Sequence, residues 1–217
     1  ANVAIAAHPD LVYAGVRYHD PATGQVRRTL LAADLVGKVM AMGKVTDFQE
    51  VGRCRGRDLE HAEYRHPLLD RISPIVLADY VSVEDGTGLV HTAPGHGAED
   101  YQTGRKYQLA VLSPVDSSGR FTVEAPEWLT GQQVFAANPK IIEHLKESGF
   151  LFHQAPLTHS YPHCWRCKKP IIFRATEQWF VAVDHNDLRG RTLKAIENVK
   201  WLPGWGRTRI DAMVSLR

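Results

Sequence analysis

The sequence predicts an α+β domain dominated by strands, closed or nearly closed into a β-barrel with peripheral helices, and followed by a small C-terminal return segment. Three observations support this fold class. Strand patterns fill the first 135 residues, turn-forming residues separate them at short intervals, and few stretches have helical periodicity. The chain has 217 residues, 44% of them hydrophobic, so it can bury a substantial core.

Short segments of strand character follow one another along the chain. The first two flank His8, Pro9 and Asp10, which we interpret as the turn of a hairpin. A tight turn at Asp85 and Gly86 introduces a later strand, and residues 116–119 form another expected turn. The expected strands span residues 3–7, 11–18, 25–32, 75–78, 81–83, 87–92 and 111–114. Many short strands favour a barrel over a doubly wound sheet.

Three helices are expected. One spans residues 99–109 and follows a glycine-rich loop. A second begins with Asn138 as N-cap and Pro139 at the first helical position, and it ends at Gly149. The third spans residues 188–199, where the apolar residues follow a helical spacing.

Composition divides the chain into two parts. We expect a barrel domain over residues 1–157 and a return segment over residues 158–217. Residues 163–217 carry 11 Lys and Arg against 5 Asp and Glu, whereas residues 1–162 carry 15 against 19. The basic part can meet RNA phosphates, an acidic neighbouring domain or only solvent. The chain begins within an apolar strand pattern and stops without a terminating signal, so we interpret it as an excised domain.

Several classes of protein are excluded by composition. No apolar run approaches the roughly 18 residues that span a bilayer, so no membrane partner is expected. Three cysteines, an odd number, argue for a reducing compartment rather than a secreted disulfide scaffold. The predicted location is the cytoplasm.

Residues 86–101 form the most informative stretch, with two histidines, a carboxylate and four glycines in sixteen residues. His91 lies on an expected strand, His96 in the following loop, and Asp100 in the first turn of an expected helix, so the stretch is typical of a binding site. Imidazole and carboxylate can bind zinc, but this spacing matches no helical zinc-hydrolase pattern. The alternative is structural: His91 is a satisfied barrel histidine and Asp100 stabilises a helix start.

The same stretch resembles the hallmark of the editing insertion of the isoleucyl-tRNA synthetase family, a hydrolytic domain inserted into the class I catalytic fold. Residues 1–6 resemble the family's strand after its threonine-rich peptide, and residues 159–167 and 170–180 resemble its return path to the catalytic core. The similarity therefore extends across the chain. The sister valyl and leucyl enzymes usually lack the His-Thr pair of residues 91–92.

The resemblance implies a proofreading hydrolase that deacylates mischarged Val-tRNA(Ile) by excluding isoleucine on size. One methylene is worth only about 1–3 kcal/mol in a pocket, a limit for which isoleucine and valine are the standard example. The implied partners are the tRNA(Ile) 3′ end carrying valine and the rest of the synthetase, and editing needs no cofactor. The parent enzyme is an ATP-dependent ligase, but the class I signature motifs do not occur in this chain.

The resemblance also implies roles for individual residues. The carboxylate matching Asp100 holds the α-ammonium of the misattached amino acid, and the histidine matching His91 shapes the wall around its side chain. We treat these two as the catalytic pair without assigning His91 as a general base. The other implied substrate-binding residues are Asn2, Thr92, Pro94, Gly95 and His96.

The family's threonine-rich peptide would lie before Ala1. The resemblance therefore implies a chain that folds but hydrolyses poorly, because part of its site is absent. The alternative is a noncatalytic tRNA-binding or docking module of a synthetase, in which the glycine-rich loop is purely structural.

Cysteine spacing indicates half of a metal site. Cys164 and Cys167 form a Cys-x-x-Cys pair, whereas a tetrahedral thiolate site needs two such pairs. The resemblance implies a structural zinc completed by residues outside this chain. Zinc bound by this chain alone would need His159 or His163 as well. Cys54 is isolated and is interpreted as a small, semi-buried thiol.

Three arginines alternate at positions 53, 55 and 57. They can contact tRNA, but alternate spacing on a strand also gives an ordinary solvated face. The sequence leaves both interpretations open.

Overall fold

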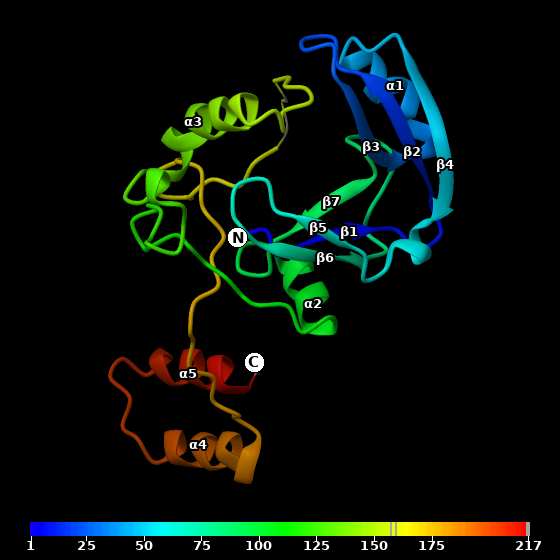
Figure 1. The fold of residues 1–217 in the computed structure, drawn as a ribbon. Helices are drawn as coiled ribbons and strands as arrows, with labels where there is room; N and C mark the ends of the chain where they lie inside the picture. Colours follow the sequence, from blue (N-terminus) through cyan, green and yellow to red (C-terminus); the bar gives the residue numbers. More distant parts are fainter. Residues whose placement is uncertain (157, 159, 216–217) are drawn as a thin grey trace. The chain divides into compact units, whose positions relative to one another are not determined.

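The structure is a computed structural model that describes residues 1–156, 158 and 160–215. It divides into two compact units, Ala1–Ala175 and Thr176–Arg217 (Figure 1). The expected domain boundary between residues 157 and 158 stays a prediction, and residue 157 lies outside the described residues.

A four-stranded sheet lies at the centre of the first unit. Its strands are β1 (Ala4–Ala7), β5 (Glu63–Arg65), β6 (Ile72–Leu77) and β7 (Leu89–Thr92). The order across the sheet is β5-β6-β1-β7. β1 runs parallel to β6, with Ile5 opposite Ile75, and antiparallel to β7, with Ile5 opposite His91. This register fixes where His91 stands.

A second sheet has three antiparallel strands in the order β3-β2-β4. Its strands are β2 (Val12–His19), β3 (Val26–Ala32) and β4 (Phe48–Arg55). The register between β2 and β4 shifts at Gly15 and Val16, which pair with Gly52 and Glu50, so Val51 is the extra residue of a β-bulge. Figure 1 shows this sheet in blue and cyan.

The predicted closed or nearly closed barrel is wrong. The fold is α+β, but both sheets are open: the larger one ends at β5 and β7 and the smaller one at β3 and β4. The sheets meet where Ala32 N–H donates to the Thr87 carbonyl at 2.8 Å, not through a shared ladder. Extended segments can be predicted from local sequence, whereas their pairing partners depend on contacts far along the chain.

The predicted hairpin around Pro9 is also wrong, because β1 and β2 belong to different sheets. Residues 81–83 and 111–114 form no strand. Val81 is buried without being in a strand, so its apolar character reflects burial alone. The strands near residues 25–32, 75–78 and 87–92 are confirmed as β3, β6 and β7. β4 and β5 were not predicted.

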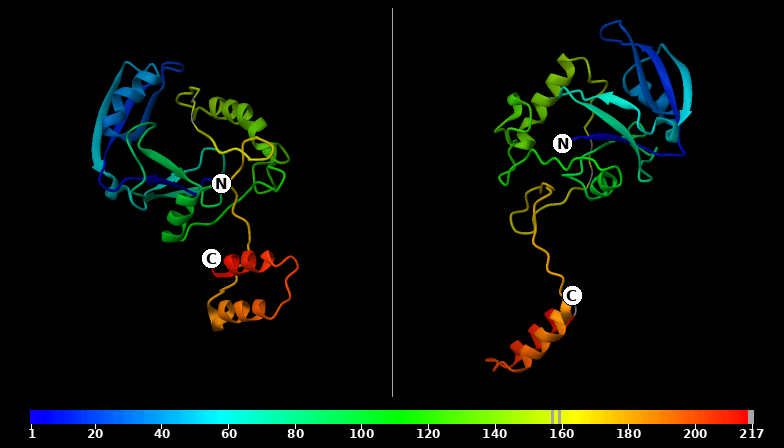
Figure 2. Two further views of the ribbon diagram at one scale, coloured as in Figure 1. Left: turned by 180° about the vertical axis from the view of Figure 1, so that it is seen from behind. Right: turned by 60° about the horizontal axis from the view of Figure 1, so that its bottom comes forward.

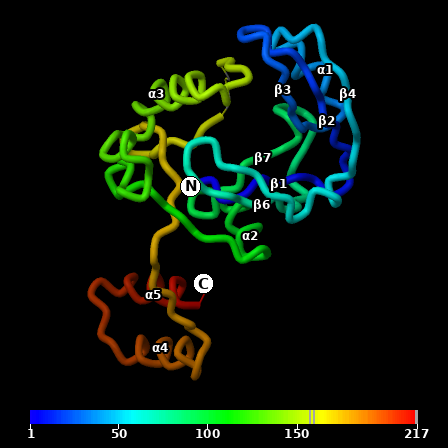
Figure 3. The backbone as a smooth tube through the Cα atoms, viewed as in Figure 1, coloured from blue at the N-terminus to red at the C-terminus, as the bar shows by residue number. Residues whose placement is uncertain are grey.

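Five α-helices are described. They are α1 (Val36–Met42), α2 (Ala98–Lys106), α3 (Val134–Glu147), α4 (Leu188–Glu197) and α5 (Trp205–Ser215). Short 3-10 helices occur at Ala33–Leu35, Gly56–Leu59, Glu127–Leu129 and His185–Asp187. α2 and α4 confirm the helices expected over residues 99–109 and 188–199, within three residues at each end. Figure 3 traces the long irregular segment between α2 and α3.

α3 begins earlier than the sequence predicted. Gln133 is its N-cap and accepts a hydrogen bond from Ala136 N at 3.0 Å, so Asn138 is not the cap. Pro139 lies inside the helix, which is tolerated near the exposed first turns because the carbonyl it leaves unpaired can meet water. The predicted stop is confirmed: Gly149 follows the helix with φ +71°.

Two groups of buried side chains hold the first unit together. α1 packs Val36, Val39 and Met40 onto the face of the smaller sheet that carries Val16 and Tyr18. Both views in Figure 2 show α1 against these strands. A second cluster forms on the larger sheet around Ala4, Ala6 and Val76, with Tyr107 and Leu109 packed against it. Apolar burial of this kind is the main stabilising contribution to such a unit.

The second unit consists of α4 and α5 with the turns around them. Trp201 Nε1 donates to the Ile196 carbonyl at 3.0 Å, which closes the end of α4. Arg189 donates to Asp184 at 2.8 Å and to the Val214 carbonyl. Within the described residues, no helix is both long and apolar enough to span a bilayer.

Candidate functional site

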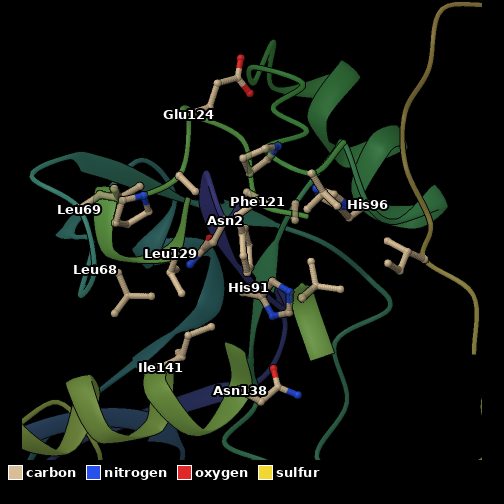
Figure 4. Close-up of a pocket in the computed structure, with 18 of the residues that line it drawn as sticks. Asn2, Leu68, Leu69, His91, His96, Phe121, Glu124, Leu129, Asn138 and Ile141 are labelled. Carbon is tan, nitrogen blue, oxygen red and sulfur yellow. The ribbon is translucent and has the colours of Figure 1, made fainter. Parts of the chain in front are cut away.

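A cavity of about 490 Å³ lies in the first unit, between β7, the loop before β6 and helix α3. Its walls are mainly apolar, with a few polar groups among them, a composition typical of ligand sites. The lining residues that Figure 4 labels are Asn2, Leu68, Leu69, His91, His96, Phe121, Glu124, Leu129, Asn138 and Ile141.

His91 is held in this cavity by the strand that carries it. It lies on β7 opposite Ile5, and its side chain is exposed and lines the cavity. Figure 4 shows its imidazole between Phe121 on one side and Asn138 of α3 on the other. The ring therefore forms part of the cavity wall.

His96 lines the same cavity and is tied to the return segment. Its Nδ1 lies 2.8 Å from the Phe173 carbonyl oxygen, which can only accept, so Nδ1 carries a hydrogen. Nε2 is buried and has no hydrogen-bond partner among the described residues. Ala175 N–H also donates to the Gly95 carbonyl at 2.7 Å. Two hydrogen bonds therefore join the loop after β7 to residues 173–175.

Asp100 connects the start of α2 to the end of β7. It lies in the first turn of the helix, and its Oδ2 accepts a hydrogen bond from Ala93 N–H at 2.8 Å. Oδ1 accepts no hydrogen bond from any described residue. Ala93 lines the cavity but Asp100 is not among the lining residues. The carboxylate thus holds the cavity's backbone and retains one free oxygen.

Three other predicted site residues stand behind the cavity wall rather than on it. Thr92 and Pro94 are fully buried. Gly95 is required by a close approach: a Cβ there would lie 2.1 Å from the Leu112 carbonyl oxygen. The glycine accommodates the protein's own backbone, whereas the resemblance implied a substrate-binding residue.

His66 is a cavity residue that the sequence did not indicate. It is 8% exposed, and its Nδ1 accepts a hydrogen bond from Leu68 N–H at 3.0 Å. Burial, together with the charge of Arg71, lowers the pKa of this imidazole to about 4, so it is neutral near pH 7. With Nδ1 accepting, Nε2 carries the hydrogen. A histidine beside Pro67 and two leucines in a loop was the only local signal.

Asn2 is positioned by the strands around it. Tyr64 donates its hydroxyl to Asn2 Oδ1 at 3.1 Å, and Arg71 donates to the Asn2 carbonyl. Asn138 and Ile141 of α3 complete the opposite wall. The sequence assigned these last two to a helix but not to a site, because their place depends on how α3 packs.

Cys164 and Cys167 lie in one turn, where Cys164 N donates to the Lys169 carbonyl at 2.8 Å. Hydrogen bonds from the backbone of Cys167 and then of Arg166 hold the pKa of the Cys164 thiol below its ordinary value. A thiolate there suits a zinc ligand, but no group of three or more metal-binding side chains occurs in the described residues. The pair fits half of a site, and His159 lies outside the described residues.

The structure also shows the surroundings of the alternating arginines and of Cys54. Arg53 pairs with Glu50 at 2.7 Å, and Arg57 pairs with Asp10. Burial raises the pKa of the Cys54 thiol, as does nearby Asp58, so the flanking arginines do not activate it. The semi-buried thiol is the interpretation that fits.

The cavity combines an apolar lining with a few polar groups, among them His66, Asn138 and the carboxylate of Glu124. It can enclose a small apolar group and offer a hydrogen from His66. Cavities of several hundred cubic ångströms hold ligands larger than one amino acid.

Sequence comparisons give matches along the whole chain. A family model described as "Leucyl-tRNA synthetase, editing domain" matches residues 34–147, just over half of the chain. The isoleucine–tRNA ligase of Fervidobacterium pennivorans is 52% identical over 217 residues, and that of Thermotoga neapolitana is 52% identical over 219 residues. Each alignment covers 100% of this chain and 23% of the relative. The chain therefore spans about a quarter of the length of these relatives.

A solved structure has a similar fold. It is titled "The crystal structure of GlLeuRS-CP1", and it aligns with a TM-score of 0.53 over 72% of this chain and 79% of that chain. At 15% sequence identity, this similarity supports the fold alone.

Proposed function

The chain belongs to the editing-domain family of the aminoacyl-tRNA synthetases, on the isoleucyl-tRNA synthetase branch, and from this premise we propose that it hydrolyses the ester of valine mistakenly joined to tRNA(Ile). Its partners in this proposal are the 3′ end of that tRNA and the remainder of a synthetase. We propose the ATP-dependent joining of isoleucine to tRNA only for a protein as long as the isoleucine–tRNA ligase relatives, and not for this chain.

The observation that carries the proposal is the imidazole of His91 projecting into an apolar cavity of about 490 Å³. The cavity is too large to distinguish valine from isoleucine by its whole volume. Discrimination by one methylene therefore needs a local wall. We assign that wall to His91, opposite Asn138 on α3.

Ester hydrolysis requires little chemistry from the protein. A water attacks the ester carbonyl carbon, the carbonyl oxygen becomes an oxyanion, and the ribose oxygen leaves with a proton. The α-ammonium of the aminoacyl group gives the substrate a positive charge near the reacting bond. We propose that Asp100 attracts this ammonium through Oδ1, because Oδ2 is occupied by Ala93 N–H.

We assign supporting roles to the other residues that the sequence predicted for the site. Asn2 and His96 contribute lining groups, whereas Thr92, Pro94 and Gly95 form the rigid backbone behind them. The reaction as proposed requires no metal or cofactor. Water positioning and charge account for every step.

The alternative, a noncatalytic tRNA-binding module, makes a different prediction. We expect purified chain to deacylate Val-tRNA(Ile) above the spontaneous rate and to bind a nonhydrolysable valyl-adenosine analogue more tightly than its isoleucyl counterpart. Absence of both would reject the hydrolase. Binding of RNA without any aminoacyl preference would instead support the alternative.

A further inference from the structure

Two arginines face each other on the smaller sheet. The register between β2 and β3 places Arg17 directly opposite Arg28. Both side chains are exposed. Side chains alternate across a strand, so these two lie on the face of Gly15 and His19, opposite the face that α1 covers at Val16.

Neither guanidinium has a hydrogen bond or ion pair with any described residue, which distinguishes them from the arginines around them. The other six arginines of residues 1–80 each contact a carboxylate or carbonyl oxygen. They are Arg27, Arg53, Arg55, Arg57, Arg65 and Arg71.

Nearby carboxylates do not neutralise the pair. Asp47 is close to His19, with Oδ2 2.7 Å from Nδ1, and Glu50 is paired with Arg53. On its other side Arg17 faces Gln49, which is uncharged. Like charges placed directly opposite each other destabilise a sheet. An anion that binds both guanidiniums would remove this repulsion.

The row next to the pair carries few side chains. Gly15 pairs with Gly52 of β4 and with Leu30 of β3, and of these three only Leu30, which is partly buried, has a side chain. A Cβ at Gly52 would have nothing within 4 Å, and one at Gly15 would meet Val51 at 3.4 Å and the Gly52 carbonyl oxygen at 3.9 Å. A positively charged face with few side chains beside it leaves room for a polyanionic backbone.

We propose that Arg17 and Arg28 form a phosphate-binding site for the backbone of the tRNA, on the open face of the β3-β2-β4 sheet. The planar guanidinium donates paired hydrogen bonds that match phosphate oxygens. Only the identification of this RNA as a tRNA rests on the proposed function. Neither arginine lines the cavity, so the site contributes to RNA affinity and not to ester cleavage.

The test compares Arg17→Ala, Arg28→Ala and the double variant with Arg53→Ala. Arg53 is a matched control because it lies exposed on the same sheet but is already paired with Glu50. Binding of a fluorescent RNA minihelix with a single-stranded 3′ end is measured by anisotropy over a series of salt concentrations. We expect each of the first two substitutions to weaken RNA binding several-fold. Each should also reduce the slope of the logarithm of the binding constant against the logarithm of salt concentration by about 0.7–1 in magnitude. Arg53→Ala should leave both unchanged.

Three outcomes would overturn the site: no RNA binding by the wild-type chain at low salt, a double variant with wild-type affinity and slope, or an equal loss in Arg53→Ala. Polyglutamate is tested in parallel. A selective loss of polyglutamate binding, with RNA binding intact, would assign the face to an acidic protein and reject RNA.

A small substrate separates this proposal from the proposed function. Hydrolysis of a valyl-adenosine ester, which has no RNA backbone, should proceed at the same rate in the double variant and in the wild type. If no form of the protein cleaves the ester or prefers the valyl-adenosine analogue but RNA binding depends on both arginines, the phosphate site stands and the hydrolase fails. If the ester is cleaved but RNA binding does not depend on the arginines, the hydrolase stands and the phosphate site fails.

Discussion

Asp100 Oδ2 lies 2.8 Å from the backbone nitrogen of Ala93 and accepts its hydrogen. This bond joins the first turn of α2 to the residue that follows β7. The carboxylate therefore has two separable properties: a hydrogen bond that shapes the cavity wall, and the negative charge that we propose attracts an ammonium group.

Substitutions of Asp100 distinguish these two properties. Asp100→Asn keeps an oxygen for Ala93 N–H but removes the charge, whereas Asp100→Ala removes both. We expect each variant to lose about tenfold or more in affinity for a valyl-adenosine analogue, since hydrogen bonds to charged groups contribute about 1.5–3 kcal/mol. Calorimetric titration measures this loss. Wild-type affinity in Asp100→Asn would limit the residue to supporting the loop.

His91→Ala tests the size limit. Removing the imidazole enlarges the cavity where it faces Asn138, so isoleucine should enter. We expect deacylation of Ile-tRNA(Ile) to rise about tenfold or more, in line with the 1–3 kcal/mol that one methylene is worth. Val90→Ala is the control, because Val90 is the neighbouring strand residue and does not line the cavity. Unchanged stability of Ile-tRNA(Ile) with His91→Ala would rule out this role.

Gly95→Ala tests the close approach behind the cavity. An added Cβ would lie 2.1 Å from the Leu112 carbonyl oxygen, and backbone must move to accept it. Overpacking of this kind typically costs about 1–3 kcal/mol. Urea unfolding should show a lower midpoint. Gly52→Ala, where nothing lies within 4 Å, should not lower stability by a comparable amount. Equal midpoints for the two variants would show that the loop adapts freely.

Local features of this fold were predictable from the sequence, and long-range ones were not. The turn at residues 116–119 forms as predicted, with Gly119 N–H donating to the Asp116 carbonyl at 3.1 Å. The α2 region was also predicted, because a helix start after a glycine-rich loop is a local signal. The pairing of strands was not predictable from local sequence. β1 lies between β6 and β7, and both of these strands come much later in the chain. The barrel prediction failed at this step.

The candidate site shows the same division. His91, His96 and Asn2 were identified through the family resemblance, and all three line the cavity. His66 was missed because its loop reaches the cavity only through the pairing of β5 with β6. Asn138 was missed because its helix begins at Val134 rather than at Asn138 itself. Both misses depend on tertiary packing that periodicity does not report.

His66 should make the stability of the protein depend on pH between about 4 and 6.5. Burial and Arg71 lower the pKa of its imidazole from 6.5 to about 4 in the folded protein. Between these values the unfolded chain binds a proton that the folded chain does not, so stability rises with pH and is lost as pH falls from 6.5 toward 4. Above pH 6.5 the neutral form prevails in both states and the contribution is fully present.

The variant His66→Asn isolates this effect. Its side-chain oxygen can still accept the Leu68 N–H hydrogen bond, which His66 Nδ1 accepts at 3.0 Å, but it does not titrate. Urea unfolding at several pH values measures the free energy of unfolding. As the pH falls, this free energy should decrease less steeply for the variant than for the wild type, by up to about 1.4 kcal/mol per pH unit for one proton. Parallel slopes would mean that the imidazole titrates alike in the folded and unfolded chain, so that burial does not lower the pKa of His66.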